Sequence, residues 1–411
     1  MKRLLFLLAL CPLLSALAAQ PNIVVFISDD HSQLDSQAYG STEVRTPNMK
    51  RLAEEGLKFT HAFVASPACG PSRTALLTGL WSARNGAEAN HNAKKPEVPS
   101  LPTVLRSLGY EMAIIGKVAH GDWAKFYEFD TVLGPSVGIS DTAEVAKFLN
   151  ERTSKKPLCL FVGTRHPHVP WSDERSYDPA KVAIPPTHVD TAVTREQRAS
   201  YLTDITKSDT LLGEVRALAR EKIAGDTLFI YTADHGGQWP FGKWNLYDGG
   251  IRIPLIIAWP GTLKPATTSD TPVWSTDFYP TLLSLAGLAA RPEQHRDGLD
   301  ISSLLRGETA PARDTFYWHY PHYHGSTWAP GGAMREGDWK LIEHFDEGSA
   351  ELFNLKTDLS EKTNLAKTEP QRLQAMQAKL AAWRKETGAY MPVPGVTPEK
   401  PKKKGKEKKT E

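Results

Sequence analysis

The sequence predicts an α/β protein with a large mixed, mostly parallel sheet flanked by helices, followed by a small antiparallel subdomain. Short apolar runs rich in β-branched residues alternate with helical segments along most of the chain. Such alternation is typical of parallel sheets whose faces are covered by helices. Beyond the segment 306–313 the strands become short and closely spaced, which indicates an antiparallel sheet.

Five apolar runs are predicted as strands of the large sheet, at 21–28, 111–115, 158–163, 227–232 and 254–259. Four of these runs are followed closely by polar or charged residues: Asp29-Asp30, Lys117, the segment 165–168 and Asp234-His235. Ligands of parallel sheets lie beyond the carboxyl ends of the strands. These residues are therefore expected to converge on one site.

Helices are predicted between the strands, at 47–56, 72–79, 101–108, 195–218 and 277–286. Thr46 is the expected N-cap of the first helix, with Pro47 in its first turn. The second helix would place Cys69 beside free backbone N–H groups, at the positive end of a helix dipole.

The C-terminal part is predicted to hold four short strands, at 315–320, 333–336, 339–343 and 351–354, and a closing helix at 370–387. We therefore expect an N-terminal α/β domain over residues 20–308 and a C-terminal α+β subdomain over residues 309–392.

The two ends of the chain differ in composition from the rest. Lys2 and Arg3 precede the apolar stretch 4–14, so residues 1–19 are predicted to be a signal peptide for export to the periplasm or outside the cell. The stretch is too short to cross a bilayer, and no stable membrane insertion is expected. The lysine-rich tail 393–411 is predicted to be disordered. The formal net charge is only +2, so nucleic acid is not an expected partner.

Three carboxylates stand at predicted strand ends: Asp29, Asp30 and Asp234. Their oxygens suit a hard cation such as Ca²⁺ or Mg²⁺. Adjacent aspartates often cap a helix or a turn instead, but carboxylates directly after a buried strand need a partner. The imidazole of His235 suits transition metals better than calcium, so the residues alone leave the identity of the ion open.

Cys69 lies in the segment 69–79, which reads Cys-Gly-Pro-Ser-Arg-Thr-Ala-Leu-Leu-Thr-Gly. A free cysteine is most often a buried structural residue. This segment, however, resembles the Cys-x-Pro-Ser-Arg-x-x-x-Leu-Thr-Gly motif of the formylglycine-dependent sulfatases, which belong to the alkaline phosphatase-like superfamily. The resemblance implies that a maturation enzyme oxidises Cys69 to formylglycine. Cys159 would then have no disulfide partner.

The same resemblance implies a metal site and extends over nearly the whole mature chain. Its ligands would be Asp29, Asp30, Asp234, His235 and the modified Cys69, and the ion would be Ca²⁺ or Mg²⁺.

Catalytic roles also follow from the resemblance. Arg73 would hold the aldehyde hydrate, while Lys117 and Lys243 would bind the sulfate group. One hydroxyl of the hydrate would attack sulfur as His168 protonates the departing oxygen. His120, at the end of a Gly-Lys-x-x-His segment, would take the proton of the second hydroxyl so that sulfate leaves.

The expected substrate is a sulfated saccharide, contacted by His319, His322, His324 and Trp328 through aromatic faces and ring nitrogens. Three alternatives stay open: S–N cleavage as in sulfamidases, hydrolysis of phosphate or phosphonate esters, and a catalytically inactive glycan-binding protein. Lys243 favours an O-sulfatase, because sulfamidases tend to carry arginine at that position.

Overall fold

The computed structural model describes residues 20–309, 313–325 and 327–393. The predicted signal peptide and nearly all of the predicted lysine-rich tail lie outside these residues. Within the described part, no helix is long and apolar enough to cross a membrane.

A nine-stranded sheet forms the centre of the fold, in the order β4-β3-β5-β1-β6-β7-β2-β8, with β9 paired to β2. The five predicted strands are β1 (Asn22–Ser28), β3 (Glu111–Gly116), β5 (Leu158–Gly163), β6 (Thr227–Ala233) and β7 (Arg252–Ala258). The sheet also contains strands that were not predicted from the sequence: β2 (Leu57–Phe63), β4 (Thr131–Leu133), β8 (Thr267–Ser269) and β9 (Val273–Trp274).

The sheet is mostly parallel, as predicted. β1 lies between β5 and β6 and is parallel to both. β7 alone among the described strands of this sheet runs the other way, antiparallel to β6 and to β2. The carboxyl end of β7 therefore lies at the opposite edge from the ends of β1, β3, β5 and β6.

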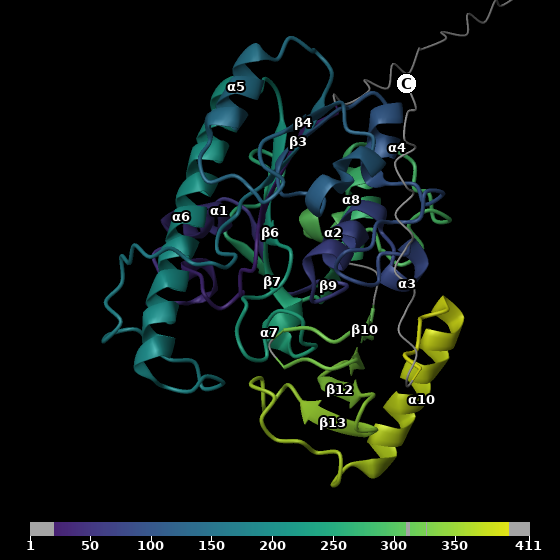
Figure 1. Cartoon of the computed structure of the whole chain (residues 1–411). Helices are drawn as coiled ribbons and strands as arrows, with labels where there is room; N and C mark the ends of the chain where they lie inside the picture. Colours follow the sequence, from purple (N-terminus) through teal and green to yellow (C-terminus); the bar gives the residue numbers. More distant parts are fainter. Residues whose placement is uncertain (1–19, 310–312, 326, 394–411) are drawn as a thin grey trace, which may run out of the picture.

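Helices cover both faces of the sheet (Figure 1), and alternating residues of β1 pack against the helices of one face or the other. Val24 and Phe26 join a core with α1 (Pro47–Glu54), α5 (Ala143–Glu151) and α6 (Ala192–Lys222). Ile23, Val25 and Ile27 join the opposite core, with α2 (Cys69–Thr78), α4 (Leu101–Ser107) and α8 (Phe278–Leu285). A strand buried on both faces is continuously apolar, which is why this run was recognisable in the sequence.

Short helices complete the N-terminal part. They are η1 (Gln37–Tyr39), α3 (Ser82–Asn85), η2 (Gly121–Phe126), α7 (Asp248–Ile251), η3 (Ser275–Asp277) and α9 (Ser302–Leu305). None of these short helices was predicted, and neither was α5.

The cap of α1 differs from the prediction. The Thr46 side chain makes no capping hydrogen bond, and its hydroxyl instead accepts from the backbone N–H of Gln37 at 2.8 Å. Asp209, on α6, accepts from the backbone N–H groups of Asn48 and Met49 at 3.0 and 2.8 Å. The cap comes from a distant helix, so a local sequence rule could not find it.

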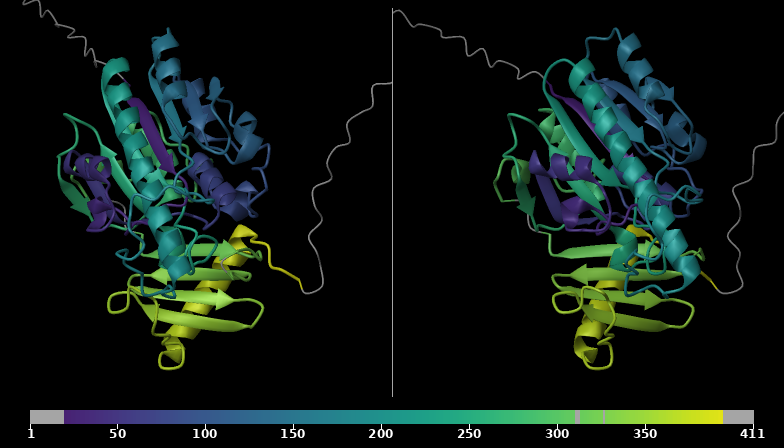
Figure 2. Two further views of the ribbon diagram at one scale, coloured as in Figure 1. Left: turned by 60° about the vertical axis from the view of Figure 1, so that its left-hand side comes forward. Right: turned by 90° about the vertical axis from the view of Figure 1, so that its left-hand side faces the viewer.

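The small C-terminal sheet is antiparallel, in the order β10 (Thr315–Tyr320), β11 (Gly331–Glu336), β12 (Trp339–His344) and β13 (Ser349–Asn354). The helix α10 (Pro370–Thr387) packs on one face through Met376, Leu380 and Trp383. The other face carries Phe316 and Trp318 into the core of the large domain. Figure 2 shows this sheet as a separate layer beneath the main body. The fold class predicted from the sequence is confirmed.

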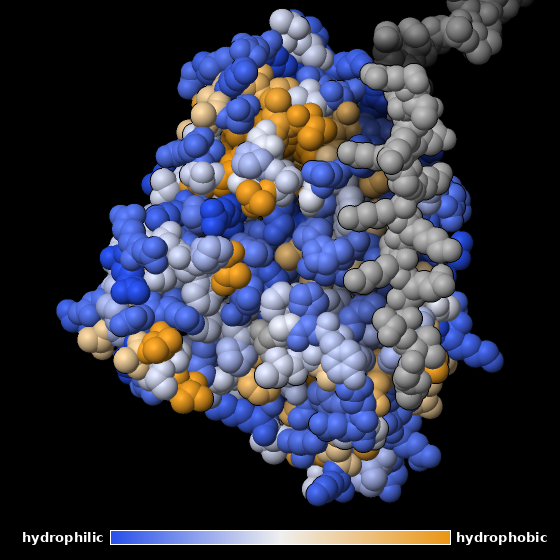
Figure 3. Space-filling view, viewed as in Figure 1, coloured by the Kyte–Doolittle hydropathy of each residue, from blue (hydrophilic) through white to orange (hydrophobic). Residues whose placement is uncertain are grey.

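The face seen in Figure 3 is mostly hydrophilic, with apolar side chains gathered in its upper part over β3 and β4. Val132, in the middle of the edge strand β4, is 53% exposed. The edge strand is only three residues long, and short edges resist pairing with other chains.

A buried ion cluster joins the two sheets. Lys340, on β12, is fully buried, and its Nζ lies 2.7 Å from Asp248 Oδ1 and 2.6 Å from Glu361 Oε1. The backbone N–H of Asp248 also donates to Glu361 Oε2 at 2.7 Å. Asp248 is the first residue of α7, so this cluster anchors the loop that leads to it from β6.

This cluster predicts a pH dependence of stability. Burial raises the pKa of Glu361 from 4.5 to about 7, with Lys340 opposing the shift and Asp248 adding to it. A raised folded-state pKa means that the folded protein keeps a proton that the unfolded chain has lost. The contribution of Glu361 to stability should therefore be present below pH 4.5 and be lost as pH rises towards about 7.

We expect Glu361→Gln, which resembles the protonated acid, to remove this dependence, whose slope is at most about 1.4 kcal/mol per pH unit. The measurement is the thermal unfolding midpoint of both proteins between about pH 5 and about pH 8. An identical pH profile for the two proteins would contradict the assignment.

Candidate active site

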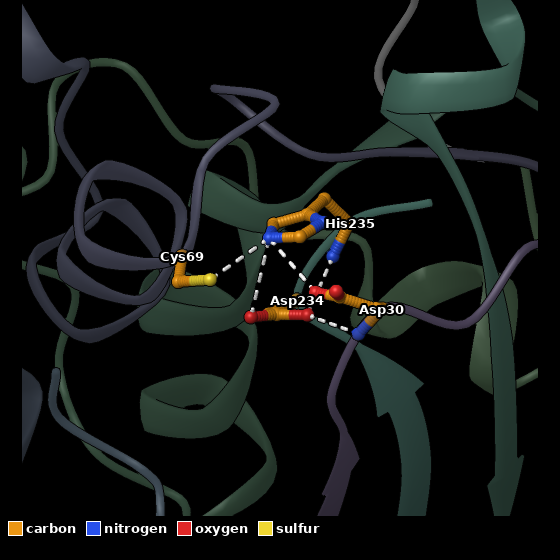
Figure 4. Close-up of side chains that lie close together, drawn as sticks. All are labelled: Asp30, Cys69, Asp234 and His235. Atoms are coloured by element: carbon orange, nitrogen blue, oxygen red, sulfur yellow. Dashed lines mark hydrogen bonds and ion pairs between the residues drawn. The ribbon is translucent and has the colours of Figure 1, made fainter. Parts of the chain in front are cut away.

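Three parallel strands and one helix deliver these predicted site residues to one place. Asp29 and Asp30 follow β1, Lys117 follows β3, and Asp234 follows β6, while Cys69 is the first residue of α2. Figure 4 shows Cys69, Asp30, Asp234 and His235 pointing toward one another. The convergence expected from the strand ends is present in the structure.

Four of the five predicted metal ligands form a compact buried group. One ligand atom from each of Asp30, Cys69, Asp234 and His235 lies within 4.8 Å of the others. His235 Nε2 lies 3.1 Å from Cys69 Sγ and 3.5 Å from a carboxylate oxygen of each aspartate.

The orientation of His235 suits a metal ligand. Its Nδ1 lies 3.0 Å from the carbonyl oxygen of Gly236, so an Nδ1–H donates there and Nε2 faces the carboxylates. A hydrogen bond of this kind fixes the imidazole tautomer of a metal-binding histidine. Burial lowers the pKa of His235, but Asp234, Cys69 and Asp30 raise it to about 9, because the cluster attracts positive charge. Two carboxylates and an imidazole are a donor set that fits a divalent cation.

Asp29, the fifth predicted ligand, is not among the residues whose ligand atoms lie within 4.8 Å of one another. Its Oδ1 lies 3.1 Å from Arg73 Nη2, and its Oδ2 lies 2.5 Å from Lys117 Nζ. Cys69 Sγ lies 4.0 Å from Oδ1. Both carboxylate oxygens of Asp29 therefore contact cationic side chains.

Each of the three carboxylates is paired with a buried cation. Lys243 Nζ lies 2.9 and 2.8 Å from the two oxygens of Asp30. Arg73 donates from Nε to Asp234 Oδ2 at 3.0 Å and also contacts Asp29. Burial would raise the pKa of Asp234, but Arg73 and His235 hold it well below its ordinary value. Asp234 therefore stays ionised although it is buried.

Position 69 lies in an electropositive environment. Cys69 is 2% exposed at the N-terminus of α2, with Lys117 Nζ 3.8 Å from its sulfur. Burial raises the pKa of the thiol, but Lys117, Lys243 and His235 together lower it to about 6. Negative charge on a group at this position is stabilised by the surrounding cations and by the helix dipole.

The two predicted catalytic histidines lie in different electrostatic surroundings. His168 Nδ1 lies 2.6 Å from the carbonyl oxygen of Val169. Burial lowers the pKa of His168, but its hydrogen bond to Cys69 and the charge of Asp30 raise it above its ordinary value. Burial, Lys117 and Arg73 lower the pKa of His120 to about 3. His168 is thus suited to donate a proton, and His120 is held neutral.

The four predicted substrate contacts separate into two pairs. His324 is half-buried and stacks on Trp244, with ring centroids 4.1 Å apart and planes 16° from parallel. His322 is half-buried and packs edge-on against Tyr320. Trp244 directly follows Lys243, so the His324 ring lies beside the candidate sulfate-binding lysine.

His319 and Trp328 are more deeply placed. His319 Nε2 lies 2.6 Å from the carbonyl oxygen of Tyr390, and Trp328 is only 4% exposed. Trp328 nevertheless lines a cavity of about 450 Å³ beside Asn245 and Asp346. A larger cavity, of about 600 Å³, lies between the segments 32–35, 185–188, 239–242 and 359–362, and none of the predicted site residues lines it.

His91, which was not predicted as a site residue, lies next to His120. Its Nδ1 lies 3.3 Å from His120 Nε2. The residue stands in an irregular loop between α3 and α4, where no periodic pattern marks it, and only the fold brings it to the Gly-Lys-x-x-His segment.

The chain is similar to known proteins in sequence and in fold. The sulfatase family model matches residues 21–288, and a model described as N-sulphoglucosamine sulphohydrolase, C-terminal, matches residues 234–386. An ulvan-active sulfatase from Formosa agariphila is 30% identical over 343 residues, covering 81% of this chain and 67% of the relative. The human N-acetylgalactosamine-6-sulfatase is 27% identical over 362 residues, covering 72% of this chain and 68% of the relative.

Solved structures share the fold at lower identity. A protein in complex with its substrate D-glucosamine-2-N,6-O-disulfate is similar with a TM-score of 0.75 at 21% identity, covering 90% of this chain and 98% of that chain. A phosphonate monoester hydrolase of Agrobacterium radiobacter is similar with a TM-score of 0.77 at 20% identity, covering 90% of this chain and 96% of the hydrolase. The family model spans more than half of the chain, and the chain belongs to the sulfatase family, whose members hydrolyse sulfate esters on an alkaline phosphatase-like fold.

Proposed function

We propose that the chain is an exported sulfatase that hydrolyses sulfate esters of carbohydrates through formylglycine at position 69. The observation that carries the proposal is the position of Cys69 at the N-terminus of α2, beside a buried group of carboxylates and cations. That group offers binding for an anion and stabilisation for a charged transition state.

Three cations are available to the sulfuryl oxygens. Arg73, Lys117 and Lys243 are buried, and each already pairs with a carboxylate. Burial strengthens their attraction for an anion, because the local dielectric is lower than in water. We assign Lys117 and Lys243 to the sulfate group and Arg73 to the group at position 69.

Formylglycine hydrate would supply two hydroxyls on one carbon, one to attack sulfur and one whose deprotonation expels sulfate. His168, with its raised pKa, would protonate the departing oxygen of the saccharide. His120, held neutral beside Lys117 and Arg73, would accept the proton of the second hydroxyl.

We further propose that Asp29, Asp30, Asp234, His235 and the modified residue 69 hold a divalent cation, most favourably Ca²⁺ because three of the donors are carboxylates. The ion would supply Lewis acidity at the sulfuryl oxygens. Lys117 and Arg73 would hold Asp29 in place.

Two alternative activities remain, S–N cleavage within the same family and hydrolysis of phosphate or phosphonate esters within the same superfamily. The match of residues 234–386 to the C-terminal model of N-sulphoglucosamine sulphohydrolase favours S–N cleavage as the second candidate. The fold is also that of a phosphonate monoester hydrolase. Assays with matched sulfate, sulfamate and phosphate compounds separate the three, and we expect the O-sulfate to be hydrolysed fastest because Lys243 stands where sulfamidases tend to carry arginine.

The proposal includes the division of the chain and its export. The catalytic domain would end near residue 308, and the C-terminal subdomain would close the saccharide-binding side of the site. Residues 1–19 would direct export to the periplasm or outside the cell, and the maturation enzyme would be the partner required before the protein is active.

We predict that Cys69, in protein from a host with the maturation enzyme, carries an aldehyde. Cys69→Ala should lower turnover by about a thousandfold or more, because the nucleophile is removed, and should leave the fold intact. Mass spectrometry of the peptide that contains residue 69 and sulfate-release assays check both points.

Cys159→Ala is the matched control, because Cys159 is also buried but lies in β5, with burial raising the pKa of its thiol. It should keep its activity. Active wild-type protein that carries only an unmodified thiol at position 69 would refute the proposal.

We predict that His324 and His322 determine saccharide affinity. His324→Ala should raise KM for a sulfated saccharide by about tenfold and leave KM for a small aryl sulfate nearly unchanged, because the aryl ester reaches only the sulfate pocket. Trp328 and His319 are less suitable probes of binding, since their rings are buried and hydrogen-bonded to the backbone, at Tyr320 and Tyr390 respectively.

The control is Tyr323→Ala, which alters an exposed neighbour in the same loop. If His324→Ala slows both substrates in equal proportion, His324 acts on the catalytic centre and the specificity assignment fails.

A further inference from the structure

His120 has one nitrogen with a partner and one without. Its Nε2 lies 3.3 Å from His91 Nδ1, whereas its Nδ1 is buried and makes no hydrogen bond within the described part of the chain. The His120 ring contacts two other rings, His91 at a centroid distance of 5.2 Å and Trp123 at 5.3 Å. Two neighbouring rings therefore hold His120 while its Nδ1 is buried.

The His91–His120 hydrogen bond can be made by either of two tautomers. If His91 donates from Nδ1, a neutral His120 carries its proton on the other nitrogen, and an N–H is then buried without an acceptor. If His120 donates from Nε2, its Nδ1 is a bare lone pair. An orphaned buried N–H is rare in proteins, and leaving one unpaired is costly.

The surroundings favour the second arrangement. Lys117 and Arg73 are cations close to His120 and lower its pKa, so near them a lone pair on the buried Nδ1 is better tolerated than an N–H group. His91 is exposed, so its own Nε2–H can be hydrated when its Nδ1 accepts the hydrogen bond.

The loop that carries His91 is fixed to the helix that begins at position 69. The backbone N–H of Gly70 donates to Asn90 Oδ1 at 3.0 Å. A Cβ on Gly70 would lie 2.4 Å from the carbonyl oxygen of Asn90, so the two segments approach more closely than a side chain would allow. His91 thus keeps a constant position relative to residue 69.

We propose that His91 is a positioning residue for His120: by accepting a hydrogen bond from Nε2–H, it keeps Nδ1 of His120 unprotonated and ready to accept a proton in the active site. The inference rests on the proposed function for the identity of that proton, which would come from the second hydroxyl at position 69. The assignment of the tautomer itself does not depend on the reaction.

The experiment compares three variants with the wild type. His91→Phe keeps an aromatic ring but removes the acceptor, and His91→Asn places an amide oxygen close to the position of Nδ1. His61→Phe is the matched control, since His61 lies on β2 and contacts Thr60, away from the site. Each protein is examined by long-range ¹H–¹⁵N NMR of its histidines and by steady-state kinetics with a small aryl sulfate.

In the spectra, we expect wild-type His120 to be protonated on Nε2, with Nδ1 bare, and His91→Phe to lose that preference. In the kinetics, we expect His91→Phe to lower kcat about 10- to 100-fold with KM within about twofold, and His91→Asn to recover most of kcat. The control should match the wild type in both.

Wild-type His120 protonated on Nδ1 would overturn the inference. So would a His91→Phe variant whose defect lies in KM, or one that His91→Asn does not improve. A wild-type protein with the expected tautomer that cleaves no sulfate ester would leave the positioning role intact and refute the proposed function instead.

Discussion

The structure depends on charge compensation in a place that water does not reach. Asp29, Asp30 and Asp234 stand at the ends of two central strands that are buried on both faces. Removing one partner from a buried ion pair lowers the stability of the fold by about 3–5 kcal/mol, because the remaining charge is buried and unsolvated. Each buried carboxylate therefore needs a cationic partner. In the described structure the partners are Arg73, Lys117 and Lys243, each from a different segment of the chain.

The need to pair each buried carboxylate with a cation explains why the loops around the site are closely packed. Lys243 reaches Asp30 from the connection between β6 and β7, and the same connection is anchored to the small sheet by the pairing of Asp248 with Lys340. On the other side, Asn90 holds its loop to the first turn of α2. The two sheets therefore stabilise one site, although all of its charged groups come from the N-terminal part.

Much of the site could be predicted from the sequence, and the reason is physical. A continuously apolar strand ending in a carboxylate is visible in a single sequence, and the carboxyl ends of parallel strands must meet. The positions of Asp30 and Asp234 followed from this argument. The predicted ligand set did not anticipate that Asp29 contacts Arg73 and Lys117 with both oxygens.

Features that depend on distant segments were not predictable. The reversed direction of β7 follows from its pairing with β6 and β2, not from its composition. The cap of α1 comes from Asp209, about 160 residues away along the chain. Trp328, expected at a sugar-binding surface, is largely buried because the loop from β10 folds its ring inward, where Nε1 donates to the carbonyl of Tyr320.

The most direct test of the account is the effect of calcium on unfolding. We predict that added Ca²⁺ raises the unfolding midpoint of the wild-type protein in a concentration-dependent manner, because a ligand that binds only the folded state stabilises it. Asp234→Asn should lose this response, and Asp226→Asn, which alters an exposed aspartate, should keep it. An equal response in Asp234→Asn and the wild type, or full sulfatase activity in protein that elemental analysis shows to be free of divalent metal, would contradict the account.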